Sequence, residues 1–274
     1  MSDNNVKQVG ELMPVLLDET DCNCEKHGAY RGKPMQTNFF GKNRIIEPPC
    51  PACEKEEAEK KEAEKKDQNA RNERLRKAEI YEKYQKMNIG EKFWGESFDT
   101  FKTYTDELKN YFNICKSFAE DHQGRMLVML GNNGNGKDHL AISVLKIIGG
   151  YMYSVFELEM LLRRCYTGKS SEWALFQRLC NAPLLVINEI GRHKAGDWEL
   201  NFLSHIVNKR YENMKPLILI TNKHLKDHCT EKDGCKDCLQ NYIGNDIISR
   251  IIEGGEIMIF TGEDYRMKIR EGSV

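Results

Sequence analysis

The chain has 274 residues, with 41 lysines and arginines against 42 aspartates and glutamates and a formal net charge of -1 at pH 7. This balance excludes a protein that binds nucleic acid through an overall basic surface, so any such contact has to come from a local patch. No apolar run reaches the ~20 residues that span a bilayer, and the N-terminus lacks the pattern of a secretory signal. We therefore expect a cytoplasmic protein without a membrane contact. Its 10 cysteines are then metal ligands or buried thiols rather than disulfides.

Composition divides the chain into three expected domains, over residues 1–53, 54–87 and 88–274. The first is rich in loops and in cysteine. The second, EKEEAEKKEAEKKDQNARNERLRKAEIYEKYQKM, has no Gly or Pro and is typical of a solvated helix held by i,i+4 charge pairs. Because it lacks sustained apolar heptads, we expect a helical linker rather than a coiled coil.

The first region contains the pattern of a zinc-binding module. Cys24-x-x-His27 is followed by Cys50-x-x-Cys53, and each x-x turn lets two side chains converge on one tetrahedral ion. Cys22 is an alternative ligand in place of Cys24 or His27, because a Cys-x-Cys pair also permits chelation. A region so poor in apolar residues is expected to need the metal in order to fold.

From Asn88 onward, strand and helix patterns alternate. The apolar runs RMLVMLG, PLLVINEIG and KPLILITN are typical of parallel strands buried on both faces. The segments KDHLAISVLKIIGG, FELEMLLRRCY and WELNFLSHIVNKRYENM have helical spacing, and EIMIFTGEDYR is expected to be an edge strand. This order predicts a doubly wound α/β domain, with a parallel sheet flanked by helices.

The segment GNNGNGK (131–137) lies between a predicted buried strand and a predicted helix. In this context GxxxxGK is a phosphate-binding loop, whose backbone N–H groups and lysine hold phosphates at a helix N-terminus. We therefore predict binding of ATP with Mg²⁺. Asp138 follows the lysine, where Ser or Thr usually contacts the metal. The predicted cofactor-binding residues are Gly131, Gly134, Asn135, Gly136, Lys137, Asp138, His139 and Asn188.

Two later strands end in polar residues that fit the same site. Asn188 and Glu189 stand where P-loop ATPases usually carry Asp-Glu, the Asp for Mg²⁺ and the Glu for the attacking water. Glu189 fits the second role, whereas Asn188 brings no charge. Asn222 ends LILITN as a sensor of the γ-phosphate or as a plain turn residue. We hypothesise that Asp138 supplies the anionic metal contact that Asn188 cannot; the alternative is a degenerate site that binds nucleotide poorly.

Four segments occur in an order and spacing that resemble the DnaC/DnaI-type replicative helicase loaders, AAA+ ATPases similar also to IstB: GNNGNGKDHLAISV, LLVINEIG, LILITNKH and ISRIIEGGEIMIFTGEDYR. The likeness covers about residues 88–270. It implies an AAA+ core that binds the hexameric replicative DNA helicase, helps to place it on single-stranded DNA, and uses ATP as a switch. It also implies self-association through the AAA+ domain on the helicase, and a zinc module that docks to the helicase.

The resemblance also assigns roles to single residues. It implies that Lys137 binds phosphate, that Glu189 is the catalytic glutamate and that Asn222 is the sensor. Arg250 falls at the position of the arginine finger, which reaches the nucleotide of a neighbouring subunit. A surface salt bridge is the alternative for Arg250. The chain departs from the family at Asp246, where loaders commonly have another arginine.

The segment RRCYTGKSSEW (163–173) lies near the loop with which such loaders contact single-stranded DNA. Basic residues interleaved with an aromatic suit phosphate contact and base stacking. A solvated helix end is the alternative. The candidate DNA-binding residues are Arg163, Arg164, Tyr166 and Lys169.

A second cysteine and histidine cluster, HLKDHCTEKDGCKDCLQ, occupies residues 224–240. A second metal site and a variable surface insertion are both open, and the insertion is favoured because loaders usually have a shorter connection here. The cluster contains His224, His228, Cys229, Cys235 and Cys238. The remaining cysteines lie in apolar contexts and are expected in the core: Cys115, Cys165 and Cys180.

Two other functions remain open. One is an IstB-like ATPase that regulates transposition, and the other is an adaptor that binds the helicase without hydrolysing ATP. A zinc module joined by a helix to the ATPase core favours the loader over the transposition regulator. The altered metal-ligand positions, Asp138 and Asn188, keep the adaptor open, and weak turnover is expected.

Overall fold

A computed structural model describes residues 15–39, 42–168, 170–192, 196–229, 235, 238–262 and 264. The chain divides into two compact units, an N-terminal unit, Met1–Glu79, and a core unit, Ile80–Val274. The predicted linker is covered by one helix, α1 (Pro51–Lys86), which crosses the boundary between the units. The division into three domains stays a prediction.

The N-terminal unit contains short antiparallel strands rather than the loops that we expected. One sheet has the order β1-β4-β5, and β2 pairs with β3 in a hairpin. The chain turns between β2 and β3 with a left-handed glycine, Gly28 (φ 79°). These strands have no apolar alternation, because most of their side chains are exposed, and this is why their sequence pattern was missed. The strands are β1 (Val15–Leu16), β2 (Thr20–Cys24), β3 (Gly28–Gly32), β4 (Met35–Phe39) and β5 (Lys42–Ile46).

Helix α1 is solvated along its length. None of its residues up to Lys86 is buried. Ion pairs with i,i+4 spacing run along it, such as Lys61–Glu57 at 2.7 Å and Lys77–Glu73 at 2.6 Å. Each exposed pair contributes about 0.3–0.5 kcal/mol. The charge pattern therefore supports the helix, as expected.

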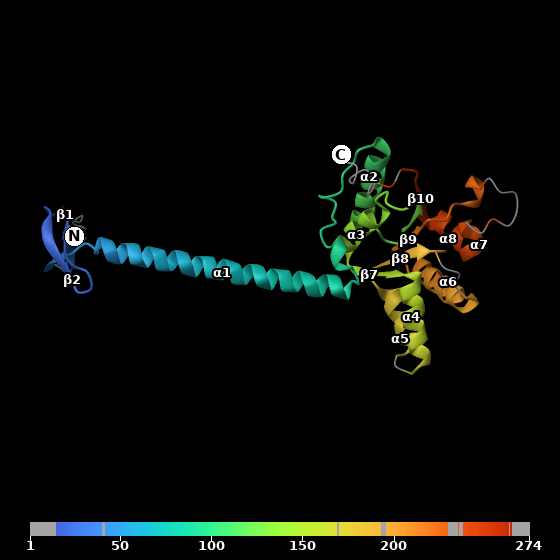
Figure 1. The fold of residues 1–274 in the computed structure, drawn as a ribbon, viewed down its shortest axis with the longest axis horizontal. Coiled ribbons are helices and arrows are strands. Elements are labelled where there is room, and N and C mark those ends of the chain that lie inside the picture. The colour runs from blue at the N-terminus through green and yellow to red at the C-terminus, as the bar shows by residue number, and fades with distance from the viewer. Residues whose placement is uncertain are drawn as a thin grey trace, which may run out of the picture. The chain divides into compact units, whose positions relative to one another are not determined.

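Among the described residues of the core unit, five parallel strands form one sheet with the order β10-β6-β9-β8-β7 (Figure 1). The predicted parallel α/β sheet is confirmed, with β10 at one edge. We missed β7, whose sequence GYMYS begins at the second of two glycines after α3 (Lys137–Ile148) and has no long apolar run. The strands are β6 (Met126–Gly131), β7 (Gly150–Ser154), β8 (Leu184–Ile190), β9 (Leu217–Thr221) and β10 (Gly255–Phe260).

Helices cover both faces of this sheet (Figure 1). Alternate side chains of each strand point to opposite faces: Leu127 and Val186 pack toward α2 and α3, whereas Val128 and Ile187 pack toward α4 to α8. The helices are α2 (Asp106–Glu120), α3 (Lys137–Ile148), α4 (Val155–Tyr166), α5 (Glu172–Asn181), α6 (Asp197–Glu212), α7 (Leu239–Ile243) and α8 (Asn245–Gly254), with 3-10 turns η1 (Glu91–Phe93) and η2 (Lys226–His228). Within the described residues, none of the helices is long and apolar enough to cross a membrane.

A buried arginine holds two connections of the core unit together. Arg210 on α6 has no exposed surface. Its guanidinium donates hydrogen bonds to the carbonyl oxygens of Leu179 (2.6 Å), Cys180 (3.2 Å), Ala182 (3.0 Å) and Pro216. Burial lowers its pKa to about 10, so it stays charged at neutral pH. The hydrogen bonds of this guanidinium thus connect the end of α5 to the residue before β9.

We expect Arg210→Lys to lower the free energy of unfolding by about 3 kcal/mol, because one ammonium cannot satisfy four buried carbonyls. Urea denaturation of the two proteins measures the difference. Lys209→Ala, at the neighbouring exposed position, is the matched control and should change stability by less than about 0.5 kcal/mol. Equal stability of Arg210→Lys and the wild type would contradict this role.

Candidate functional site

The phosphate-binding loop is closed against the edge strand. Gly131 ends β6 with φ 125°, and a Cβ there would lie 2.1 Å from the backbone oxygen of Phe260. Gly136 precedes α3 with φ 95°. Side chains are therefore excluded at both ends of the loop. The amide of Asn135, which is buried, donates to the Phe260 oxygen at 3.1 Å.

The side chain of the loop lysine points into the phosphate-binding loop. Lys137 is 5% exposed. Its ammonium donates to the carbonyl oxygens of Gly131 (2.7 Å) and Asn132, and to Oδ1 of Asn135 (3.0 Å). The cation is therefore held inside the loop at the N-terminus of α3, where backbone N–H groups also favour anions.

The two residues that depart from the usual motifs contact each other. Asn188 Nδ2, at the end of β8, donates to Asp138 Oδ1 on α3 at 2.7 Å. Asn188 Oδ1 accepts the backbone N–H of Glu189 at 2.6 Å. The nitrogen and the oxygen of the Asn188 amide thus both have hydrogen-bond partners. The Asp138 carboxylate is held next to β8.

Glu189 lies at a break in the sheet. The register between β8 and β9 shifts between Ile187 and Ile190, and Glu189 has φ 59°, which is uncommon for a residue with a side chain. A bulge at this point redirects the side chain, and strained backbone of this kind clusters at functional sites. The carboxylate forms an ion pair with Arg192, a partner that we did not predict.

The candidate catalytic glutamate, Glu189, and the candidate sensor, Asn222, line one cavity of about 230 Å³. Glu189 and Arg192 lie on its β8 side, and Asn222 and Lys223 follow β9. Asn222 Nδ2 donates to Oδ1 of Asn133 in the phosphate-binding loop at 2.9 Å. The tertiary structure therefore joins the loop, the end of β8 and the end of β9 at one edge of the sheet.

His139 contacts residues 97–101, which lie between α1 and α2, and it is not among the residues that line the cavity. Its Nε2 donates to the carbonyl oxygen of Ser97 at 2.8 Å and lies 3.3 Å from Thr100 Oγ1. The ring meets Phe101 edge-on at 5.2 Å. Burial lowers the pKa of His139, so the neutral ring anchors this segment to α3.

A second acidic side chain, which we did not predict, lies close to Asp138. Burial and then the Asp138 charge raise the pKa of Glu96 to about 7. Its Oε2 is buried without a hydrogen-bond partner among the described residues. Nothing in the surrounding sequence WGES signals this placement. Burial disfavours the charged form of this carboxyl group, and the nearby Asp138 charge adds to the effect, so Glu96 holds its proton to a higher pH than an ordinary glutamate.

Arg250 lies outside this cavity, on α8. Its guanidinium donates to the Asp246 carbonyl oxygen at 3.4 Å and lies 3.7 Å from the Asp246 carboxylate. The contact is the surface salt bridge that was the alternative for this residue. Asp246, the departure from the family pattern, is therefore the partner of the candidate finger.

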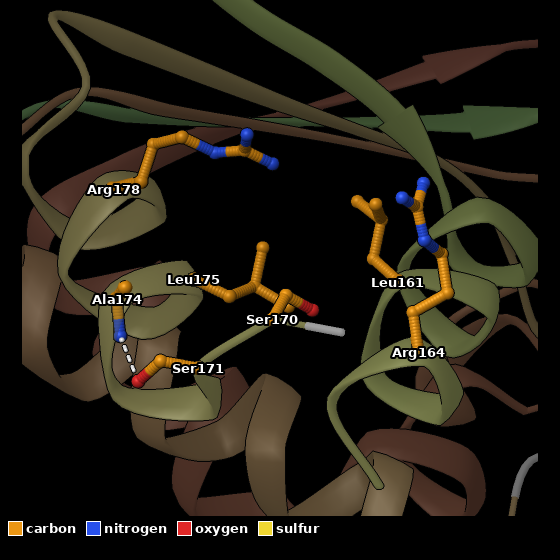
Figure 2. Close-up of a pocket in the computed structure, with 7 residues that line it drawn as sticks. All are labelled: Leu161, Arg164, Ser170, Ser171, Ala174, Leu175 and Arg178. Carbon is orange, nitrogen blue, oxygen red and sulfur yellow. Dashed lines mark hydrogen bonds between the residues drawn. The ribbon is translucent and has the colours of Figure 1, made fainter. Parts of the chain in front are cut away.

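One of the candidate DNA-binding residues, Arg164, lines another cavity, of about 270 Å³, between α4 and α5 (Figure 2). Arg164 from α4 and Arg178 from α5 line it, and Arg178 was not predicted. Arg163 forms an ion pair with Glu159 and does not line the cavity. Tyr166 is 64% exposed. Lys169 lies outside the described residues.

The N-terminal unit brings four of its five predicted metal ligands together. Ligand atoms of Cys24, His27, Cys50 and Cys53 all lie within 4.8 Å of one another. His27 Nδ1 is 3.2 Å from Cys53 Sγ and 3.8 Å from Cys24 Sγ. Cys22 is not part of this set, and its thiol instead donates to the Thr20 carbonyl oxygen at 3.8 Å. The Cys-x-Cys alternative therefore fails.

The surroundings of this cluster favour thiolates and a fixed imidazole. Backbone N–H groups of Lys26 and His27 donate to Cys24 and lower its pKa to about 6. On the far side of the imidazole ring, Nε2 lies 3.1 Å from Glu56 Oε1. A carboxylate behind a histidine fixes the tautomer that presents Nδ1 as a ligand.

Most of the chain is similar in sequence to known proteins. A model of the family IstB-like ATP binding protein matches residues 64–273. Replicative helicase loader DnaC of Escherichia coli K12 is 22% identical over 182 residues, which are 63% of this chain and 70% of that protein. DnaC of Buchnera aphidicola subsp. Schizaphis graminum is 25% identical over 199 residues, 68% of this chain and 75% of that protein.

The fold matches as well. A crystal structure of the DnaC helicase loader has a TM-score of 0.53 at 24% identity, covering 63% of this chain and 100% of that one. At this identity the likeness concerns the fold alone, and it confirms the predicted core of a parallel sheet flanked by helices. The family match extends over most of the chain. The chain therefore belongs to the IstB-like ATP binding protein family.

Proposed function

We propose that this protein is a helicase loader that binds ATP and helps to place a hexameric replicative DNA helicase on single-stranded DNA. The observation that carries the proposal is the closed phosphate-binding loop, which contacts the ends of β8 and β9 in a core similar to DnaC loaders. ATP acts as a switch, because its phosphates would contact the loop and both strand ends at once.

The residues present fit a Mg²⁺–nucleotide complex. Lys137 and the loop N–H groups bind phosphate, and Asp138 offers an anionic oxygen to the metal, with Asn188 holding that carboxylate in place. The metal neutralises charge on the phosphates when it is bound. Glu189 would orient and polarise the attacking water, and Asn222 would contact the terminal phosphate; the position of both residues in one cavity supports these roles. Glu189 has to leave Arg192 for this step.

The N-terminal cluster fits zinc. Bond lengths of about 2.3 Å to sulfur and about 2.0–2.1 Å to nitrogen give tetrahedral edges of about 3.5–3.8 Å, and the observed separations run from 3.2 to 3.8 Å. Thiolates with one imidazole favour zinc over Mg²⁺ or Ca²⁺. In our proposal this module docks to the helicase.

The other predicted contacts complete the proposal. Arg250 leaves Asp246 to reach the nucleotide of a neighbouring copy when the protein self-associates on the helicase. Arg164 and Tyr166 contact single-stranded DNA through phosphate and base. Salt weakens such phosphate contacts, so DNA binding should fall as ionic strength rises.

We expect the full-length protein to retain the replicative helicase of its host in a pull-down experiment. The double variant Cys24→Ser with Cys53→Ser should lose at least about tenfold in affinity, because the docking module loses its metal. Cys165→Ser changes a thiol outside both metal-ligand clusters and is the matched control. Absence of a wild-type complex would reject the loader and leave the transposition regulator, the second candidate.

Turnover separates a hydrolysing loader from a passive adaptor. We expect ATP hydrolysis stimulated by helicase and single-stranded DNA, and a reduction of about 100-fold in Glu189→Gln, since the amide cannot polarise water. Nucleotide affinity should change little. If the wild type and Glu189→Gln turn over equally slowly while both bind helicase, the protein is an adaptor.

Single and double variants at the two positions test the contact between Asp138 and Asn188. We expect Asp138→Ala to lose the Mg²⁺ dependence of ATP binding, because the anionic metal contact is gone. Asp138→Ser combined with Asn188→Asp should keep wild-type affinity, since the charge returns to β8. The two single variants and the double variant should show a coupling of about 1–3 kcal/mol in titrations with a fluorescent ATP analogue. If Asp138→Ala binds Mg·ATP more tightly than the wild type, the hypothesis that Asp138 supplies the metal contact missing at Asn188 is wrong.

A further inference from the structure

A second group of thiols with an imidazole lies in the core unit, and the proposed function does not use it. His224, Cys229, Cys235 and Cys238 each offer one ligand atom, and these atoms lie within 4.8 Å of one another. His224 Nε2 is 3.5 Å from Cys235 Sγ and 3.4 Å from Cys238 Sγ. These separations approach the nitrogen–sulfur edge of a tetrahedral zinc site, about 3.6 Å from ligand bond lengths.

The ligands are shielded from water. Cys235 is 7% and Cys238 2% exposed, and His224 and Cys229 are half-buried. Among the described residues, the cluster offers three sulfurs and one imidazole nitrogen. This donor set favours zinc over the hard cations that bind oxygen. A single disulfide would not account for the convergence of the third thiol and the imidazole.

Backbone contacts hold the ligands from separate segments in place. His224 forms an isolated parallel bridge with Cys238, and its carbonyl oxygen accepts the N–H of Leu239 at 2.8 Å. The amide of Asn241 donates to the Cys235 carbonyl oxygen at 2.8 Å. The positions of three ligands are therefore set by hydrogen bonds that do not involve the side chains binding the ion, as a structural metal site requires.

We propose that His224, Cys229, Cys235 and Cys238 bind a structural zinc ion that ties the end of β9 to the start of α7. Asn222 lies two residues before His224, and Cys238 is the N-cap of α7. α7 leads through Gly244 into α8, which carries Arg250. The ion thus links the strand of the candidate sensor to the helices of the candidate finger. The site stands on its ligand geometry and does not depend on the helicase role.

Metal content of the full-length protein tests this site directly. Purified in reducing buffer without chelator, the wild type should contain about two zinc ions per chain by elemental mass spectrometry. Cys235→Ser with Cys238→Ser should remove about one, as should Cys50→Ser with Cys53→Ser, and the four changes together should remove both. Cys165→Ser, outside both clusters, should retain the wild-type content.

A cobalt titration covers the case in which a variant misfolds. The Cys50→Ser, Cys53→Ser chain keeps all four core ligands, and after removal of zinc it should bind Co²⁺ with thiolate charge-transfer bands and the visible bands of a tetrahedral site. Loss of these bands in Cys229→Ser would support the ligand set. The proposal is overturned if the zinc content of Cys235→Ser with Cys238→Ser equals that of the wild type, whether that is about one ion or about two. It is also overturned if the cobalt spectrum of the Cys50→Ser, Cys53→Ser chain lacks thiolate bands.

Discussion

The parallel pairing of β6, β9 and β8 is the constraint on which the candidate site depends. Parallel strands end at the same edge of a sheet, so residues distant in sequence meet there without any long-range motif. Asn133 contacts Asn222, and Asp138 contacts Asn188, across this edge. The loop between β6 and α3 closes only because glycine at 131 lets the backbone pass against β10.

The unusual residues at this edge form a connected set. Asp138 carries a carboxylate where the usual motif has a hydroxyl, Asn188 carries an amide where the usual motif has a carboxylate, and the two side chains are hydrogen-bonded. Burial and then the Asp138 charge raise the pKa of Glu96, and the amide oxygen of Asn188 accepts the backbone N–H of Glu189, which has a positive φ. A change at Asp138 is therefore expected to affect the proposed metal contact, the protonation of Glu96 and the position of the candidate catalytic glutamate together.

The cysteines serve different purposes in the two units. In the N-terminal unit the described strands are mostly exposed, so metal–thiolate bonds would be the strongest available cross-link between β2 and the start of α1. In the core unit the fold has extensive buried sheet and helix surfaces without a metal. A metal there would set the geometry of one connection, between β9 and α7, rather than maintain the fold.

The sequence by itself determined the parallel α/β core, the phosphate-binding loop, the charged helix and the Cys-x-x-His and Cys-x-x-Cys pairs, because apolar runs, glycine spacing and charge periodicity are local properties. Only the tertiary structure decided that Asp138 contacts Asn188, that Cys22 is separate from the N-terminal cluster and that Glu96 lies near Asp138. Those relations depend on how separate segments pack and on the burial that packing imposes. No pattern in a single segment records either one, which is also why β7 and Arg192 escaped prediction.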